Sequence, residues 1–115
     1  AIILGSFGAH LFKDLISEQK LVSFETGVRY QMFHGLSILT LSLNSKSFTN
    51  MLSKVLMIMC IGVLLFSCSI YILSFRNILD INTDILGPIT PIGGMFLILS
   101  WISLLFIVKK NSSLT

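Results

Sequence analysis

The sequence predicts an all-α fold, a transmembrane four-helix bundle, on three observations. Hydrophobic residues make up 54% of the 115 residues and charged residues only 11%, with a mean hydropathy of +0.92, whereas soluble domains usually carry about 25% charged residues. Two runs without charge, 55–75 and 85–108, each match the roughly 20 residues that cross a bilayer. The length leaves room for one domain of three or four crossings. We therefore treat residues 1–115 as a single transmembrane helical domain, which excludes a large soluble enzyme domain.

The first helical segment is expected at residues 1–12. Its apolar start leads through Gly5 and Gly8 to His10, and charged residues follow. The chain opens inside this apolar run, without Met and without a charged segment before it, so we expect the first helix to be truncated at its N-terminus. Restoring that start brings the expected number of crossings to four.

The second crossing is expected at 26–43, near the end of a longer helix. Ser17 can cap that helix, and Glu18 suits its positive N-terminal turn. A helix that runs unbroken from Ser17 to Leu43 would be roughly 40 Å long. The hydrocarbon core of a bilayer is only about 30 Å thick, so the first turns should lie at the membrane interface.

The third and fourth crossings are expected at 55–75 and 88–108. Pro88 and Pro91 stand at the start of the fourth, and proline is tolerated in the first turn of a helix, so this helix should begin near one of them. The alternative is a broken or re-entrant segment that lines a cavity. Small residues allow helices to approach closely, and serines can bond to the backbone. The residues expected at helix packing positions, the two prolines included, are Gly5, Gly8, Gly27, Gly35, Gly62, Ser67, Ser69, Pro88, Pro91, Gly93 and Gly94.

Charge on the connecting segments predicts the topology. Four crossings place 13–29 and 76–84 on one side of the membrane, and 44–54 with the C-terminal tail, including Lys110, on the other. Each side carries four Lys and Arg residues, but acids count little, and Arg29 leaves the tally if it is buried in the bundle. We therefore expect both termini in the cytoplasm. The net charge of +3 reflects these flanks, and the lack of a clustered basic face excludes nucleic acid as an expected partner.

Strongly polar residues enter the second helix where it should cross the membrane. An unsatisfied polar group in lipid costs several kcal/mol, so these side chains should face partners in the bundle or lie at its edge. Glu25 and Arg29 stand one turn apart in the order that favours an ion pair. Gln31 and His34 share a helical stripe with Gly27. The predicted intramembrane polar cluster comprises His10, Glu25, Arg29, Tyr30, Gln31 and His34.

Two roles are open for this cluster. It can be structural, an ion pair and hydrogen bonds that hold helices together, or functional, since His34 with Glu25 could move a proton or hold a polar headgroup. No metal site is expected, because no ligand spacing of the HExxH type occurs. Cys60 and Cys68 are too far apart on a helix for a disulfide or a CxxC pair. No arrangement of nucleophile and base indicates an enzyme, and no cofactor is predicted.

Four segments resemble the motifs of one family of small bacterial membrane proteins. They are GSFGAH (5–10), FETGVRYQMFHGL (24–36), LLFSCSIYIL (64–73) and GPITPIGG (87–94). In this order, across almost the whole chain, they are similar to the YgdD/YwdK-like family, catalogued as domain of unknown function 423 and related to eukaryotic transmembrane protein 256. The resemblance implies four membrane helices, the first of which precedes the first motif, and it agrees with a location in the bacterial cytoplasmic membrane. It implies no activity, because none is established for the family.

The function that we expect from these features is that of a non-enzymatic accessory or assembly subunit of a larger membrane complex. The reason is the small size of the chain, which leaves almost no mass outside the membrane for independent chemistry. The expected contacts are membrane lipids and either a membrane-protein partner or a second copy of the chain. The alternative is a module that handles a lipid, a small molecule or protons at the polar cluster, and it predicts a cavity that reaches the 13–29 side of the membrane.

Overall fold

The computed structural model describes residues 1–109, and its regular elements are helices, as the composition predicts. The helices are α1 (Ile2–His10), η1 (Phe12–Asp14), α2 (Glu18–Leu43), η2 (Ser45–Ser47), α3 (Leu52–Leu79) and α4 (Leu86–Ile107), where η marks a short 3-10 helix. Within residues 1–109 no β-strand forms, and the one isolated bridge joins Phe48 to Val108. The all-α prediction is confirmed. Lys110, counted above in the C-terminal flank, lies outside the described residues.

The helix α2 begins and ends as local chemistry predicts. Ser17 has an extended backbone, and its hydroxyl accepts a hydrogen bond from the Lys20 amide at 3.4 Å, so the predicted cap is confirmed. The helix runs unbroken to Leu43. At its end the Asn44 side chain donates to the Thr40 carbonyl at 2.8 Å, which satisfies a carbonyl of the last turn. The span expected at 26–43 thus lies within a longer helix.

The two apolar helices that follow are longer than the expected spans. The helix α3 extends past 55–75 at both ends, and Asp80 ends it in the left-handed conformation with φ 49°, which Asp tolerates better than most residues. The helix α4 begins at Leu86, two residues before Pro88, as one of the two predicted starts requires, and Pro91 lies inside the helix. Pro88 falls in the first turn, where its missing N–H would have no helical partner.

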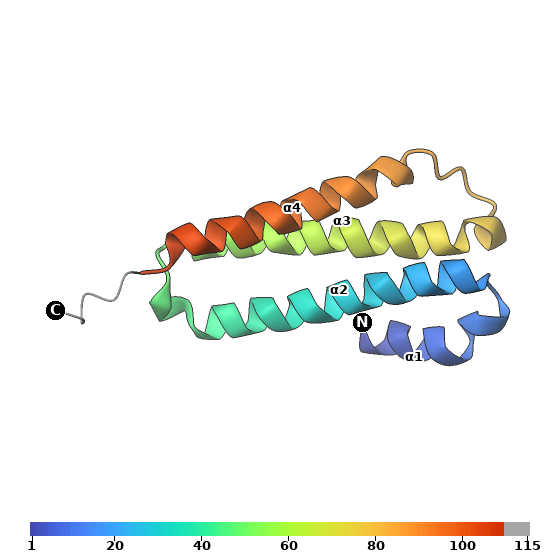
Figure 1. Ribbon diagram of the computed structural model, residues 1–115, viewed down its shortest axis with the longest axis horizontal. Helices are drawn as coiled ribbons and strands as arrows, with labels where there is room; N and C mark the ends of the chain where they lie inside the picture. The colour runs from blue at the N-terminus through green and yellow to red at the C-terminus, as the bar shows by residue number, and fades with distance from the viewer. Residues whose placement is uncertain (110–115) are drawn as a thin grey trace.

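The helices lie side by side with α3 in the middle (Figure 1). In this view α4 and α2 flank α3, and α1 lies along the first half of α2. The buried core joins α3 to α4 and comprises Leu52, Val55, Met59, Val63, Leu97 and Leu104. A second set of rings packs at the other end, where Phe24 of α2 contacts Phe12, Tyr71 and Phe75. Every buried side-chain nitrogen or oxygen in residues 1–109 has a hydrogen-bond partner.

Glycines set the closest helix approaches. A Cβ added to Gly93 would lie 2.5 Å from the Phe66 amide nitrogen and 2.9 Å from the Gly62 carbonyl oxygen, so α3 and α4 cross here with backbone against backbone. A Cβ at Gly27 would lie 2.9 Å from the Tyr71 ring, and the Ser67 hydroxyl donates to the Gly27 carbonyl at 2.8 Å.

Other residues expected at packing positions fall into two groups. Gly5 and Gly8 of α1 face α2, and the Ser69 hydroxyl lies 2.6 Å from that of Thr90 across the α3–α4 crossing. Gly35, in contrast, is exposed, and a Cβ there would meet nothing within 4 Å. Pro88 and Pro91 are also exposed. Within the described residues Gly35 therefore makes no packing contact of the expected kind.

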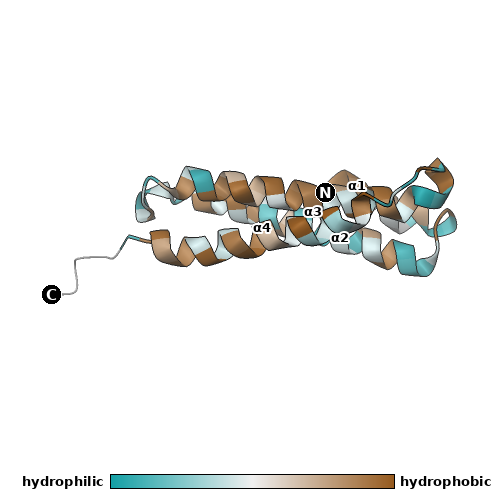
Figure 2. Cartoon of the chain, turned by 90° about the horizontal axis from the view of Figure 1, so that it is seen from above, coloured by the Kyte–Doolittle hydropathy of each residue, from teal (hydrophilic) through white to brown (hydrophobic). Residues whose placement is uncertain are grey.

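Hydrophobic residues predominate along the helices, and hydrophilic residues lie at the two ends and at a few positions between them (Figure 2). In residues 1–109, two helices are long and apolar enough to cross a membrane, α3 and α4. Large apolar side chains on both are exposed, which fits contact with lipid. By the same length and hydropathy test α1 and α2 do not qualify, because α1 is short here and α2 carries the polar residues of the predicted cluster.

Candidate functional site

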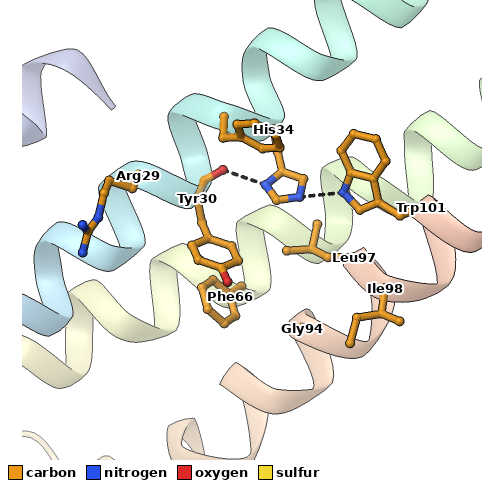
Figure 3. A pocket seen from close by; sticks show the side chains of 9 residues that line it. Arg29, Tyr30, His34, Phe66, Gly94, Leu97, Ile98 and Trp101 are labelled. Atoms are coloured by element: carbon orange, nitrogen blue, oxygen red, sulfur yellow. Dashed lines mark hydrogen bonds between the residues drawn. The ribbon is translucent and has the colours of Figure 1, made fainter.

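A groove of about 520 Å³ opens between α2 and α4, with Phe66 of α3 between them (Figure 3). This volume falls within the roughly 300–1,000 Å³ of sites that bind small molecules. The lining is mostly apolar and aromatic, and its side chains and one glycine are Arg29, Tyr30, Phe33, His34, Phe66, Gly94, Leu97, Ile98 and Trp101.

His34 holds α2 to α4 at the inner end of the groove. Its side chain is buried, with 4% of its surface exposed. Its Nδ1 lies 2.8 Å from the Tyr30 carbonyl oxygen, and the Trp101 indole N–H donates to Nε2 at 3.1 Å (Figure 3). A carbonyl can only accept and an indole N–H can only donate, so Nδ1 carries the proton and Nε2 is the acceptor. Both ring nitrogens are thereby occupied by the protein itself.

Aromatic rings form the walls of the groove. The Tyr30 ring packs on Phe66 with centroids 4.6 Å apart, and Phe33 lies 6.2 Å from Trp101. The Tyr30 side chain is 44% exposed and that of Trp101 38%. These rings offer flat apolar faces to the groove, and the Tyr30 hydroxyl, which makes no hydrogen bond within the described residues, adds one polar group.

Arg29 stands at the other end of the groove and is exposed. Its guanidinium Nη2 donates to the Thr26 hydroxyl at 3.3 Å, so the side chain bends back toward the N-terminal end of α2. Ser67 of α3 bonds to Gly27, two residues before Arg29, so Ser67 and Arg29 lie at a similar height along the helices. Arg76 follows Ser67 on α3 and lies roughly 13 Å further along the helix axis, at about 1.5 Å per residue. The bend brings the charge closer to the polar end of the helices, as long basic side chains do near membrane interfaces.

The predicted polar cluster does not assemble as one site. Within residues 1–109 no ion pair joins Glu25 to Arg29, and both side chains are exposed. Gln31 faces α3, where its Oε1 accepts from the Tyr71 hydroxyl at 2.7 Å. His10 is exposed at the end of α1. Because successive helical residues point about 100° apart, neighbours along the sequence serve different sides of α2.

Of the six cluster residues, the groove brings together three: Arg29, Tyr30 and His34. The partner of His34 is Trp101, which stands 67 residues away and was not among the predicted site residues. Phe66 and Thr90 were also missed as contact residues, since no local spacing marks them. A lone tryptophan in an apolar span is the only signal that could have drawn attention to this position.

The described residues offer no alternative centre for metal or thiol chemistry. No group of three or more His, Cys, Asp or Glu side chains lies close enough to hold a metal ion in the part of the chain that the structure describes. Cys60 and Cys68 are both exposed free thiols on α3. The groove combines aromatic rings with His34 and Arg29, and for that reason it is the candidate site.

Comparison with known proteins identifies the family. The family model described as "Protein of unknown function (DUF423)" matches residues 4–94. The chain is 37% identical over 112 residues to the UPF0382 membrane protein YwdK of Bacillus subtilis, covering 96% of this chain and 87% of that protein. It is 34% identical over 113 residues to a UPF0382 membrane protein of Haemophilus influenzae, covering 98% and 87%. No solved structure matches the chain significantly.

These matches agree with the resemblance carried by the four sequence motifs, so that prediction is confirmed. The relatives are named as membrane proteins of bacteria, and α3 and α4 have the length and hydropathy of membrane spans. Because the family model covers most of the chain, this protein belongs to the DUF423 family of membrane proteins.

Proposed function

We propose that this protein is a non-enzymatic membrane protein that binds an amphiphilic molecule of the membrane in the groove between α2 and α4. The observation that carries the proposal is the groove itself, which combines aromatic walls with a single cation at one end. A lipid matches this arrangement, because its polar head can lie at the cation and its apolar chain along the aromatic walls.

The dimensions of the groove support this occupant. On α4 it extends from Gly94 to Trp101, a length of about 10 Å along the helix axis. The residues on this side, Leu97 and Ile98 among them, offer apolar surface to a chain. His34 does not compete for the ligand's polar group, because both its ring nitrogens are already bonded.

The proposal includes an arrangement in the membrane. In it α1 and α2 cross or enter the bilayer beside α3 and α4, which completes a four-helix bundle, and both termini lie in the cytoplasm. The polar residues of α2 support this placement, because Gln31 and His34 have hydrogen-bond partners on α3 and α4. Satisfied polar groups remove most of the cost of taking such a helix into lipid.

Filling the groove tests the proposal. Gly94 lines it, and a Cβ there would come no closer than 3.8 Å to the Phe66 ring, so Gly94→Leu places its side chain in the space without a backbone clash. Gly35→Leu adds the same side chain where nothing lies within 4 Å and is the matched control. Native mass spectrometry after mild detergent extraction should find one lipid bound to the wild type and to the control, and none bound to Gly94→Leu. Equal lipid retention by both variants, or a wild type without bound lipid, would contradict the proposal.

A second candidate is the accessory or assembly subunit. It is favoured by the short connectors between the helices, 44–51 and 80–85, which leave little of the described chain outside the membrane. Its test is gentle extraction from native membranes and identification of every protein that co-purifies. A partner at constant stoichiometry would support it, and recovery of the chain alone or as a homo-oligomer would oppose it.

A further inference from the structure

We infer that the groove selects a lipid with a phosphate headgroup and that Arg29 binds the phosphate. The inference rests on the proposed function and adds the chemical class of the ligand. It concerns the end of the groove where the guanidinium lies, and it names the headgroup that the proposed function leaves open.

The polar groups that a ligand can reach in the groove can donate hydrogen bonds, and one of them, the Arg29 guanidinium, carries a positive charge. Of the five guanidinium N–H groups of Arg29, one bonds to the Thr26 hydroxyl, which leaves the others free to donate. The Tyr30 hydroxyl makes no hydrogen bond within the described residues. The Trp101 indole N–H is not available, because it donates to Nε2 of His34. Such a set fits a headgroup rich in acceptor oxygens and negative charge, and phosphate bound by Arg is the strongest pairing of this kind.

The charge of Arg29 is not already neutralised by this protein. Glu25, one turn away, forms no ion pair with it within residues 1–109. A cation without a counter-charge is unfavourable inside a membrane, and more so the further it lies from the interface. A phosphate at the guanidinium would remove that cost, so the ligand and Arg29 stabilise each other.

The direction of the Arg29 side chain also fits a headgroup that lies toward the polar end of the helices. The side chain bends toward Thr26 and hence toward the polar end formed by the start of α2 and the end of α3. The aromatic part of the groove continues from Arg29 in the opposite direction, toward Trp101. A lipid with its phosphate at Arg29 therefore directs its chain inward along the groove.

Quenching of Trp101 fluorescence can measure headgroup selectivity, because Trp101 is the only tryptophan and lines the groove. The protein is held in dodecyl maltoside micelles, which contain no phosphate, and titrated with brominated phosphatidylethanolamine or with diacylglycerol that carries the same brominated chains. The wild type should bind the phospholipid about tenfold more tightly, the effect of one charge-assisted contact of about 1.4 kcal/mol.

The matched variants assign this preference to one residue. Arg29→Gln should lower the phospholipid affinity to about that of diacylglycerol, and saturable diacylglycerol binding by this variant shows that it is folded. Arg29→Lys should retain part of the preference. Lys54→Gln removes the same charge from an exposed site at the other end of α3 and should behave as the wild type.

The outcomes separate the two proposals. Equal binding of both probes by the wild type, or a preference that survives in Arg29→Gln, would overturn the phosphate assignment and leave groove binding intact. Absence of saturable quenching by either probe would overturn the proposed function itself.

Discussion

The crossing of α3 and α4 at Gly62 and Gly93 makes stability sensitive to one methyl group at this point. In Gly93→Ala the new carbon would lie 2.5 Å from the Phe66 amide nitrogen and 2.9 Å from the Gly62 carbonyl oxygen, while unstrained contacts of this kind need about 3.5 Å or more. The helices must therefore separate by about 1 Å. Overpacking of this size costs about 1–3 kcal/mol, which exceeds the gain of about 0.5–1 kcal/mol that alanine brings to a helix.

The control for this change is Gly35→Ala, which has the same helical gain and meets nothing within 4 Å. The free energy of unfolding is measured by titration with sodium dodecyl sulfate in mixed micelles, followed by far-UV circular dichroism. Gly35→Ala should be as stable as the wild type or slightly more stable, and Gly93→Ala should be less stable than the control by about 1–3 kcal/mol. Equal stabilities of the two variants would refute the close crossing as described.

Two further predictions concern hydrogen bonds between helices. Ser67→Ala removes the 2.8 Å bond to the Gly27 carbonyl and should lower the free energy of unfolding by about 0.5–1.5 kcal/mol in the same titration, since such bonds contribute modestly within membranes; no change would show that the bond is absent in solution. Nitrogen NMR of the His34 ring should find the proton on Nδ1, and Trp101→Phe should shift the Nε2 resonance because that atom loses its 3.1 Å donor; a proton on Nε2 in the wild type would contradict the described contact.

The length of the runs without charged residues predicted the two apolar helices well, and the exact ends of these helices less well. The runs 55–75 and 85–108 lie largely within α3 and α4 because a bilayer-spanning segment must be both apolar and helical. Of the two predicted starts of α4, the one near Pro88 agrees with the helix, because a proline is tolerated in the first turn, and the one near Pro91 does not. Ser17 was correctly predicted as a cap, since its role depends on its own backbone and the next three residues.

The candidate site was predicted only in part, because it depends on how helices lie beside one another. The polar residues of α2 were found from the cost of placing them in lipid, yet Gln31 and His34 turned out to face different helices. The pairing of His34 with Trp101 joins distant segments, and neither residue carries a local pattern that names the other. A groove is a property of three packed helices, so the aromatic rings that line it could be assigned only from the fold.

The central claim is that the groove binds a specific lipid, and the most direct test is photocrosslinking from a residue in the groove in the membranes of living cells. Phe33, which lines the groove, is replaced by a benzophenone-bearing phenylalanine, and Leu105, 78% exposed on α4 outside it, is replaced in the same way as a control. After irradiation, mass spectrometry of the purified protein should find one dominant phospholipid adduct at position 33 and a mixture resembling the bulk membrane at position 105. The same bulk mixture at both positions, or an adduct with another protein at position 33, would contradict a groove that binds a specific lipid.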